Sequence, residues 1–380
     1  MKSRRITIFC ILAAASIIAK VLLAGLGCNF DTDSNFMIAD LVLDGKTVYA
    51  ETSRYNYGPA WAHAAAAIKW IQLHVFDGHS ITGFHRLLAL LLSACDVLIA
   101  LVLWRRFAFG AAVAFLVNPV SLLVSGYHSQ FDNIAVLTGF LAVLLLEAAV
   151  ADMVFLAGCA LLGFSLSIKH VLIFLPLWLA LRPDFPLKRK LSALIIPFFV
   201  FFAGFLPYIS NDAAMSGIAR NVFGYSSSHL DGFFPHLLDL AVPTAVIEKI
   251  FYWVPVFSGV KALWLAAMVG TGFVFRKLPL SGAFLFYLIS LCVFSTALSP
   301  QYLAIPMTAW AVHRRSIAMT WFVAVSAVAI LASQVNIGVV VEWLRPANAW
   351  LFQGGLGVRH AVAGLAVFIA LEIAGKPHKC

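Results

Sequence analysis

Long apolar runs separated by short polar segments dominate this sequence. The longest runs reach the roughly 20 residues that a helix needs to cross a bilayer, and several others fall short of that length. We therefore predict an all-α polytopic membrane protein with about 12 transmembrane helices, some of them short. The predicted spans are residues 6–26, 84–104, 107–125, 131–150, 152–168, 170–181, 191–210, 257–275, 280–298, 301–312, 316–336 and 358–374.

The segment after the first apolar run has a different pattern. Residues 34–43 and 60–76 carry apolar positions at helical spacing, interrupted by polar side chains such as Asp40 and Lys69. Such stretches are typical of helices that lie in the membrane interface. If 60–76 crossed the bilayer, every later loop would change sides, so we reject that alternative. The pattern predicts that residues 27–83 form a first outer loop with interfacial helices.

Basic clusters between the apolar runs predict the topology. Loops on the cytoplasmic side of a membrane carry an excess of Lys and Arg. With a cytoplasmic N-terminus, alternation of the predicted spans brings every cluster to that side, which makes both termini cytoplasmic and 211–256 a long outer loop. The clusters are Arg105/Arg106, Arg182 with Lys188 to Lys190, Arg276/Lys277, Arg314/Arg315 and Lys376/Lys379.

Composition agrees with a membrane protein. Of the 380 residues, 62% are hydrophobic and 11% are charged, and the mean hydropathy is +0.94. Soluble domains carry about 25% charged residues. We predict a single transmembrane domain over residues 1–380. The net charge of +9 comes from short loop clusters, so it indicates topology and not a nucleic-acid partner. The six cysteines show no close pair or zinc-ligand spacing.

Carboxylates gather in the first outer loop of a chain that otherwise avoids charge. Asp31 and Asp33 directly follow the first span, where desolvation would raise the pKa of a carboxyl group and suit it to general-base catalysis. In an extended segment both side chains would share one face and could bind a cation. A solvated loop charge is the simpler alternative for either residue. Which of the two would act is left open.

Three further polar turns are predicted on the same outer side. In the turn at 126–132, Asp132 could contact a substrate or cap the helix that follows. In the second turn, a Lys-His pair could bind a phosphate, although a lone lysine at a helix end often only extends toward the interface. The candidate residues of the three turns are His128, Gln130 and Asp132; Lys169 and His170; and Gln301 and Tyr302.

The order of these pieces resembles the C-type (GT-C) glycosyltransferase superfamily, the multi-span enzymes that use polyprenyl-phosphate sugars. The resemblance rests on the acidic first loop with Gly45 to Tyr49 and Arg54 to Pro59, on Gly126 to Asp132, and on Ser299 to Tyr302. It implies that Asp31 is the catalytic base, with Asp33 as the alternative, and that Lys169 contacts the donor phosphate. The substrate-binding residues that it implies are Arg54, Tyr55, Tyr57, His128, Gln130, Asp132, Lys169, His170, Gln301 and Tyr302.

The resemblance also implies an activity: inverting transfer of a hexose of the mannose or glucose class from a polyprenyl-phosphate carrier to a hydroxyl of a glycan or lipid. Transfer would occur on the extracytoplasmic face, in a bacterial inner membrane rather than the endoplasmic reticulum. The paired Asp-Glu motif of protein O-mannosyltransferases is missing, which disfavours a peptide acceptor. No cofactor is predicted, and a divalent cation stays an open alternative.

Two other functions fit a polytopic protein. A secondary transporter or lipid flippase would have a similar number of spans, but the sequence shows neither an internal repeat nor buried charges concentrated at mid-membrane. A non-catalytic subunit of a membrane assembly would make no use of an outer carboxylate.

Overall fold

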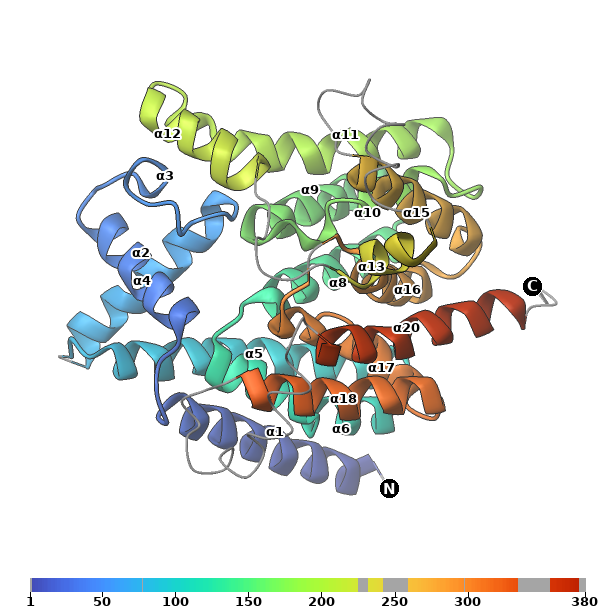
Figure 1. Ribbon diagram of the computed structural model, residues 1–380, viewed down its shortest axis with the longest axis horizontal. Coiled ribbons are helices and arrows are strands. Elements are labelled where there is room, and N and C mark those ends of the chain that lie inside the picture. Colours follow the sequence, from blue (N-terminus) through green and yellow to red (C-terminus); the bar gives the residue numbers. More distant parts are fainter. Residues whose placement is uncertain are drawn as a thin grey trace. The chain divides into compact units, whose positions relative to one another are not determined.

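The computed structural model describes residues 2–76, 78–224, 232–241, 259–296, 298–333 and 356–375. Within these residues every regular element is a helix and no strand occurs (Figure 1), which confirms the predicted all-α class. The described residues belong to two compact units, a finer division than the sequence indicates. Unit 1 comprises Met1–Ile173 and Leu191–Ser226, and unit 2 comprises Phe174–Lys190 and Ser227–Cys380.

Unit 1 contains the helices of residues 27–83 and the helices around them. Its elements are α1 (Lys2–Ala24), α2 (Phe30–Leu43), α3 (Val48–Glu51), α4 (Pro59–Val75), α5 (Ile81–Arg106), α6 (Phe109–Leu116), α7 (Pro119–Leu123), η1 (Val124–His128), α8 (Asp132–Ala148), α9 (Asp152–Ile168), η2 (His170–Leu172), most of α11 (Leu187–Ala203), η3 (Leu206–Tyr208), α12 (Asp212–Gly217) and η4 (Ile218–Phe223).

Unit 2 contains most of the later apolar helices. Its elements are α10 (Leu175–Ala180), α13 (Phe233–Ala241), α15 (Gly259–Phe275), α16 (Leu280–Phe294), η5 (Pro300–Ala304), α17 (Met307–His313), α18 (Ile317–Ser333) and α20 (Leu356–Ala374). The predicted spans 257–275, 280–298 and 316–336 and the predicted loop 211–256 lie partly outside the described residues, and Lys376 and Lys379 lie wholly outside them.

Several apolar helices of membrane-spanning length indicate a membrane protein. Among the described residues four helical stretches are long and apolar enough to cross a bilayer, and the bent pair formed by α6 with Pro119–His128 would make a fifth. The count of about 12 spans is therefore not confirmed. Some of the predicted spans are interrupted: Asn118 caps α7 before Pro119, and Pro176 and Pro306 lie within two other predicted spans.

Helices α2 and α4 pack on each other (Figure 1). Neither of them is among the candidate spans. The indole of Trp61 donates to Oδ1 of Asn35 at 2.9 Å. Lys69 lies 2.9 Å from a carboxylate oxygen of Asp40, with its ammonium 3.0 Å from the ring centroid of Phe36. These contacts between polar groups and aromatic rings hold the two amphipathic helices together.

A buried ion pair joins the helices at the centre of unit 1. Nζ of Lys20 on α1 lies 2.5 Å from Oδ2 of Asp96 on α5, and both side chains are at most 2% exposed. The same carboxylate accepts hydrogen bonds from Ser121, Ser125 and Asn133 at 2.8–3.0 Å. One ionisable pair is therefore buried inside the apolar helices of unit 1, which the hydropathy pattern did not single out.

The backbone of η1 lies directly against α1. A Cβ built on Gly126 would lie 2.9 Å from Cα of Lys20, so only glycine permits this approach. The ion pair and this contact fix η1, and with it the turn that follows at residues 128–131.

We predict that Lys20→Met and Asp96→Asn each lower the stability of the detergent-solubilised protein. Either change leaves one buried charge without its partner, which typically costs about 3–5 kcal/mol. Thermal unfolding would measure the loss, and the Lys20→Met/Asp96→Asn double variant should lose less than the sum of the single losses. Lys46→Met is the matched control, because Lys46 pairs with Asp44 on the surface. Equal melting temperatures for wild type, Lys20→Met and Lys46→Met would contradict the prediction.

Candidate functional site

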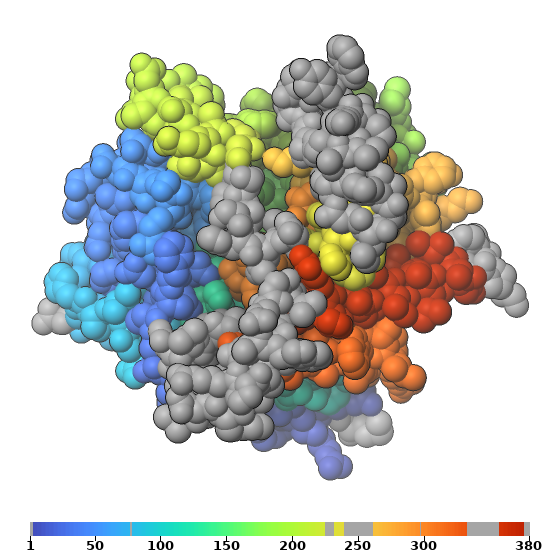
Figure 2. Space-filling model, in the orientation of Figure 1, coloured from blue at the N-terminus to red at the C-terminus, as the bar shows by residue number. Residues whose placement is uncertain are grey.

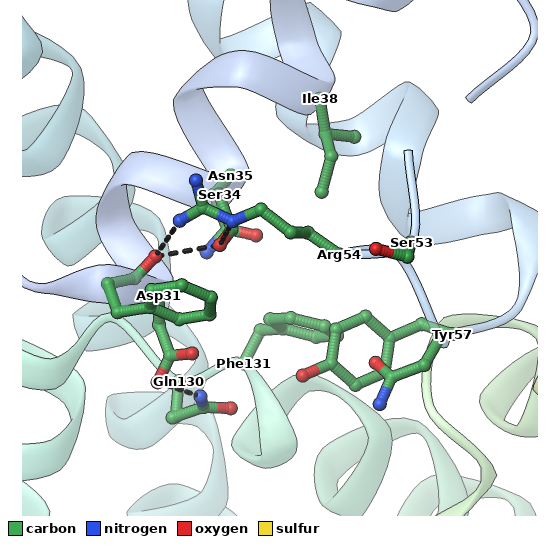
Figure 3. A pocket seen from close by; sticks show the side chains of 11 residues that line it. Asp31, Ser34, Asn35, Ile38, Ser53, Arg54, Tyr57, Gln130 and Phe131 are labelled. Atoms are coloured by element: carbon green, nitrogen blue, oxygen red, sulfur yellow. Dashed lines mark hydrogen bonds between the residues drawn. The ribbon is translucent and has the colours of Figure 1, made fainter. Parts of the chain in front are cut away.

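A cavity of about 300 Å³ in unit 1 is formed by three segments that are far apart in the sequence. The segments are the first turns of α2, the loop at residues 53–57 and the turn at Gln130 and Phe131. Figure 3 shows Asp31, Arg54 and Gln130 gathered around this pocket with the rings of Tyr57 and Phe131. Figure 2 shows the surface of this region, with residues 30–75 in blue and α12 in yellow-green beside them.

The start of α2 is tied to the turn after η1. Oδ1 of Asn29 accepts hydrogen bonds from the backbone N–H groups of Asp31 and Thr32, both at 2.9 Å, which caps the helix. The amide of Asn29 donates to the carbonyl of Tyr127 at 2.9 Å, and the hydroxyl of Thr32 donates to Ser129 at 3.2 Å. These bonds place the first turn of α2, including Asp31, opposite Gln130.

The backbone of the turn itself is unusual. Ser129 has φ 58°, and no other non-glycine residue among those described adopts a positive φ. This left-handed conformation costs about 1–2 kcal/mol for a residue with a Cβ atom. The turn between η1 and α8 therefore stores strain at the point where it presents Gln130 to the pocket.

Asp31 is a partly buried carboxylate held by two side chains. Nε2 of Gln130 donates to its Oδ2 at 2.7 Å. Nδ1 of His128 lies 3.1 Å from the same oxygen, close enough for an ion pair when the imidazole is protonated but without hydrogen-bond alignment. Burial would raise the pKa of Asp31, but the neighbouring His128, the bond from Gln130 and the charge of Lys169 outweigh it and lower the pKa. The expected raised pKa is wrong, and Asp31 is ionised at neutral pH.

Asp33 has different surroundings, because the segment is helical and not extended. Residues two apart on a helix point to different sides, so the expectation that both carboxylates share one face is wrong. Oδ2 of Asp33 accepts a hydrogen bond from Arg54 at 2.8 Å, and its side chain is 56% exposed. Asp31 lines the pocket and Asp33 does not.

Arg54 is the cation of the pocket wall. Besides its pairing with Asp33, its guanidinium donates to the hydroxyl of Ser34 and to the carbonyl of Phe30, both at 2.9 Å. It also stacks over the ring of Phe30 at 4.0 Å from the centroid. The planar, multiply bonded guanidinium is held at a fixed place beside the cavity.

Lys169 lies behind the pocket rather than in its wall. Its ammonium donates to Oε1 of Gln130 and to Oδ2 of Asp132, both at 2.8 Å, and its side chain is 3% exposed. Its position does not support the predicted contact with a phosphate. Asp132 is the first residue of α8 and pairs with Lys169, so the alternative in which it caps the helix is wrong.

Of the remaining predicted site residues, one lines the pocket and the others lie elsewhere in unit 1 or in unit 2. Tyr57 lines the pocket, with its ring 4.8 Å from that of Phe131 in a T-shaped arrangement. Tyr55 is fully buried; its hydroxyl donates to the carbonyl of Gly58 at 2.5 Å and accepts from the N–H of Ala62, which does not support a role in substrate binding. His170 begins η2 and does not line the pocket, and Gln301 and Tyr302 lie in η5 of unit 2.

The sequence analysis missed several polar and aromatic residues that line the pocket. Ser34, Asn35, Ser53 and Asn56 contribute amides and hydroxyls, and Phe131 contributes a ring that stacks on Trp61 at 3.7 Å. The polar side chains at the start of the predicted helix at 34–43 were a signal that could have identified Ser34 and Asn35. The residues that the structure describes contain no group of three or more His, Cys, Asp or Glu side chains placed to hold a metal ion.

Comparisons with known proteins give no relative for this chain. No model of a known protein family matches the sequence, and neither a curated protein nor a solved structure matches it.

The lowered pKa of Asp31 predicts a pH dependence of stability. A carboxyl group whose pKa is lowered on folding contributes stability above its ordinary pKa of 3.8, and loses it as pH falls through the folded value. Wild type should therefore melt at a higher temperature than Asp31→Asn near neutral pH, and the difference should shrink below about pH 4. Thermal unfolding of both proteins across this range measures it. A difference that stays constant down to about pH 3 would contradict the assignment.

Proposed function

We propose that this protein is an integral-membrane hexosyltransferase of the GT-C type, with its active site at the pocket of unit 1. The observation that carries the proposal is a partly buried, ionised carboxylate, Asp31, in the wall of a small cavity that also contains a fixed arginine, Arg54. A general base and a cation beside one cavity are the two groups that transfer from a sugar phosphate requires.

The lining of the pocket suits a sugar. Amide and hydroxyl groups from Ser34, Asn35 and Asn56 can exchange hydrogen bonds with sugar hydroxyls, while the rings of Tyr57 and Phe131 offer apolar faces to the C–H groups of a pyranose. A volume of about 300 Å³ lies at the lower end for ligand sites, which favours one hexose over a long glycan chain.

The reaction follows from these groups. The carboxylate of Asp31 accepts the proton of an acceptor hydroxyl, whose oxygen forms a bond to the anomeric carbon as the bond from that carbon to the phosphate oxygen breaks. Direct displacement inverts the anomeric configuration. The departing polyprenyl phosphate keeps the electron pair, and Arg54 stabilises the charge that develops on it. In this scheme Arg54 replaces Lys169 as the phosphate contact.

The topology, donor and acceptor that we propose rest on the resemblance to the GT-C superfamily and on the distribution of basic residues along the sequence. We propose about 12 spans, both termini in the cytoplasm and the pocket on the extracytoplasmic face of a bacterial inner membrane. The donor is a polyprenyl-phosphate sugar of the mannose or glucose class, and the acceptor is a glycan or lipid hydroxyl.

A secondary transporter is the second candidate, and one observation favours it. The buried Lys20–Asp96 pair, with Ser121, Ser125 and Asn133 around it, is the kind of ionisable group inside apolar helices that marks ion pathways. A transporter would depend on Asp96, and the transferase would depend on Asp31.

We predict that Asp31→Asn lowers turnover of a radiolabelled polyprenyl-phosphate hexose in reconstituted vesicles by about 100- to 10,000-fold, because it removes the general base. Asp33→Asn is the matched control, since it removes a neighbouring carboxylate that does not line the pocket, and it should keep turnover within about threefold of wild type. Intact turnover in Asp31→Asn would sink the general-base assignment. Solute uptake that is lost in Asp96→Asn and kept in Asp31→Asn would favour the transporter.

A further inference from the structure

The side-chain amide of Gln130 bridges two charged groups that are far apart in the sequence. Its Nε2 donates to Oδ2 of Asp31 at 2.7 Å, and its Oε1 accepts from Nζ of Lys169 at 2.8 Å. Gln130 and Lys169 are each 3% exposed, so water does not compete freely for either bond. A primary amide has one donor end and one acceptor end, and rotation about its last torsion exchanges them. The neighbours of Gln130 therefore decide which end faces Asp31.

Lys169 fixes this choice. An ammonium group only donates hydrogen bonds, so the carbonyl end of Gln130 must face it and the NH₂ end is turned toward Asp31. The ammonium is itself held in place: it donates to Asp132 at 2.8 Å, and the rings of Tyr57 and Phe131 lie beside it at 5.1 and 4.9 Å. It cannot follow the amide if the amide rotates.

We propose that Lys169 is a positioning residue that acts on Asp31 through Gln130. Its ammonium locks the amide of Gln130 in the one orientation that donates to Asp31, and this keeps the carboxylate ionised and fixed in the pocket wall. Without Lys169, the amide can rotate and present its carbonyl oxygen to Asp31. A carbonyl oxygen repels a carboxylate and accepts a hydrogen bond from a protonated carboxyl group, so the rotation favours the protonated form.

Of the other charged groups around Asp31, some favour the ionised form of its carboxyl group and others disfavour it. Asp33 lies on the same helix, Arg54 comes from the loop at 53–57, His128 from η1, and the Lys169–Asp132 pair from the far side of Gln130. Arg54 pairs with Asp33, and Asp132 offsets part of the charge of Lys169. His128 lies 3.1 Å from the carboxylate of Asp31, so each comparison is repeated in a His128→Gln background.

The test measures the ionisation of Asp31 directly. A hydrophobic carbodiimide modifies protonated carboxyl groups, and mass spectrometry of peptides from the full-length protein gives the extent of modification at Asp31 at each pH. We expect Lys169→Met to move the midpoint of this curve upward by about one pH unit. Gln130→Glu should also move it upward, since it keeps an oxygen for Lys169 and places a second acceptor against Asp31. The readout needs no transfer activity, so its failure and the failure of the proposed function are distinguishable.

Lys69→Met is the matched control. Lys69 is also buried, pairs with Asp40 at 2.9 Å and lies over the ring of Phe36, so its loss perturbs packing without touching Gln130. Its curve should overlay that of wild type. Unchanged midpoints in both Lys169→Met and Gln130→Glu would overturn the proposal, as would an equal shift in Lys69→Met. If Lys169→Met does not fold, Lys169→Gln takes its place, because its amide can still donate to Asp132 but no longer forces the carbonyl end of Gln130 to face it.

Discussion

Charge buried among apolar helices has to find its partners within the protein, because lipid supplies none, and this constraint organises unit 1. Lys20 and Asp96 form an ion pair inside the helices, and Lys169 and Asp132 form one at the ends of α9 and α8. Each pair joins segments that are far apart in the sequence. The turn that carries Gln130 lies between them, fixed by the approach of Gly126 to α1 and by the bonds of Asn29 and Thr32.

The pocket has two sets of charged groups: a buried pair behind it, and a pair that lines it. Lys169 and Asp132 are buried together, and Lys169 acts on Asp31 through the amide of Gln130 as well as through its charge. Asp31 and Arg54 line the cavity itself; Asp31 lies against Gln130 and His128, and Arg54 is bonded to Asp33, Ser34 and Phe30. Lys169 and Asp132 therefore support the turn from behind, while Asp31 and Arg54 border the cavity.

Part of this site could be predicted from the sequence. Asp31 and Gln130 were both selected as candidates although 99 positions separate them, and they are hydrogen-bonded in the structure. Both stood out because they are polar residues at the ends of apolar runs. The partner of Asp33 could not be predicted in the same way: the pattern does not reveal that Asn29 caps a helix at Phe30, and only that helix turns Asp33 toward Arg54.

The features that were missed or wrongly predicted from the sequence have similar physical causes. Lys20 and Asp96 lie inside apolar runs, where a single charge scarcely changes the average hydropathy, and their pairing is a tertiary contact. The positive charge of Lys169 suits a phosphate-binding residue, but the carboxylate that pairs with it belongs to Asp132, 37 positions away in the sequence. The apolar runs gave the order of the helices, while breaks at Asn118-Pro119 and at other prolines decide how many reach spanning length.

The most direct measurement is an experimental structure of the protein in lipid with a polyprenyl-phosphate hexose bound. Our account places the hexose in the pocket of unit 1, with the anomeric carbon facing Asp31, the phosphate against Arg54, and Lys169 still bonded to Gln130 and Asp132. A donor whose sugar lies outside this pocket, or whose phosphate is held by Lys169, would contradict it.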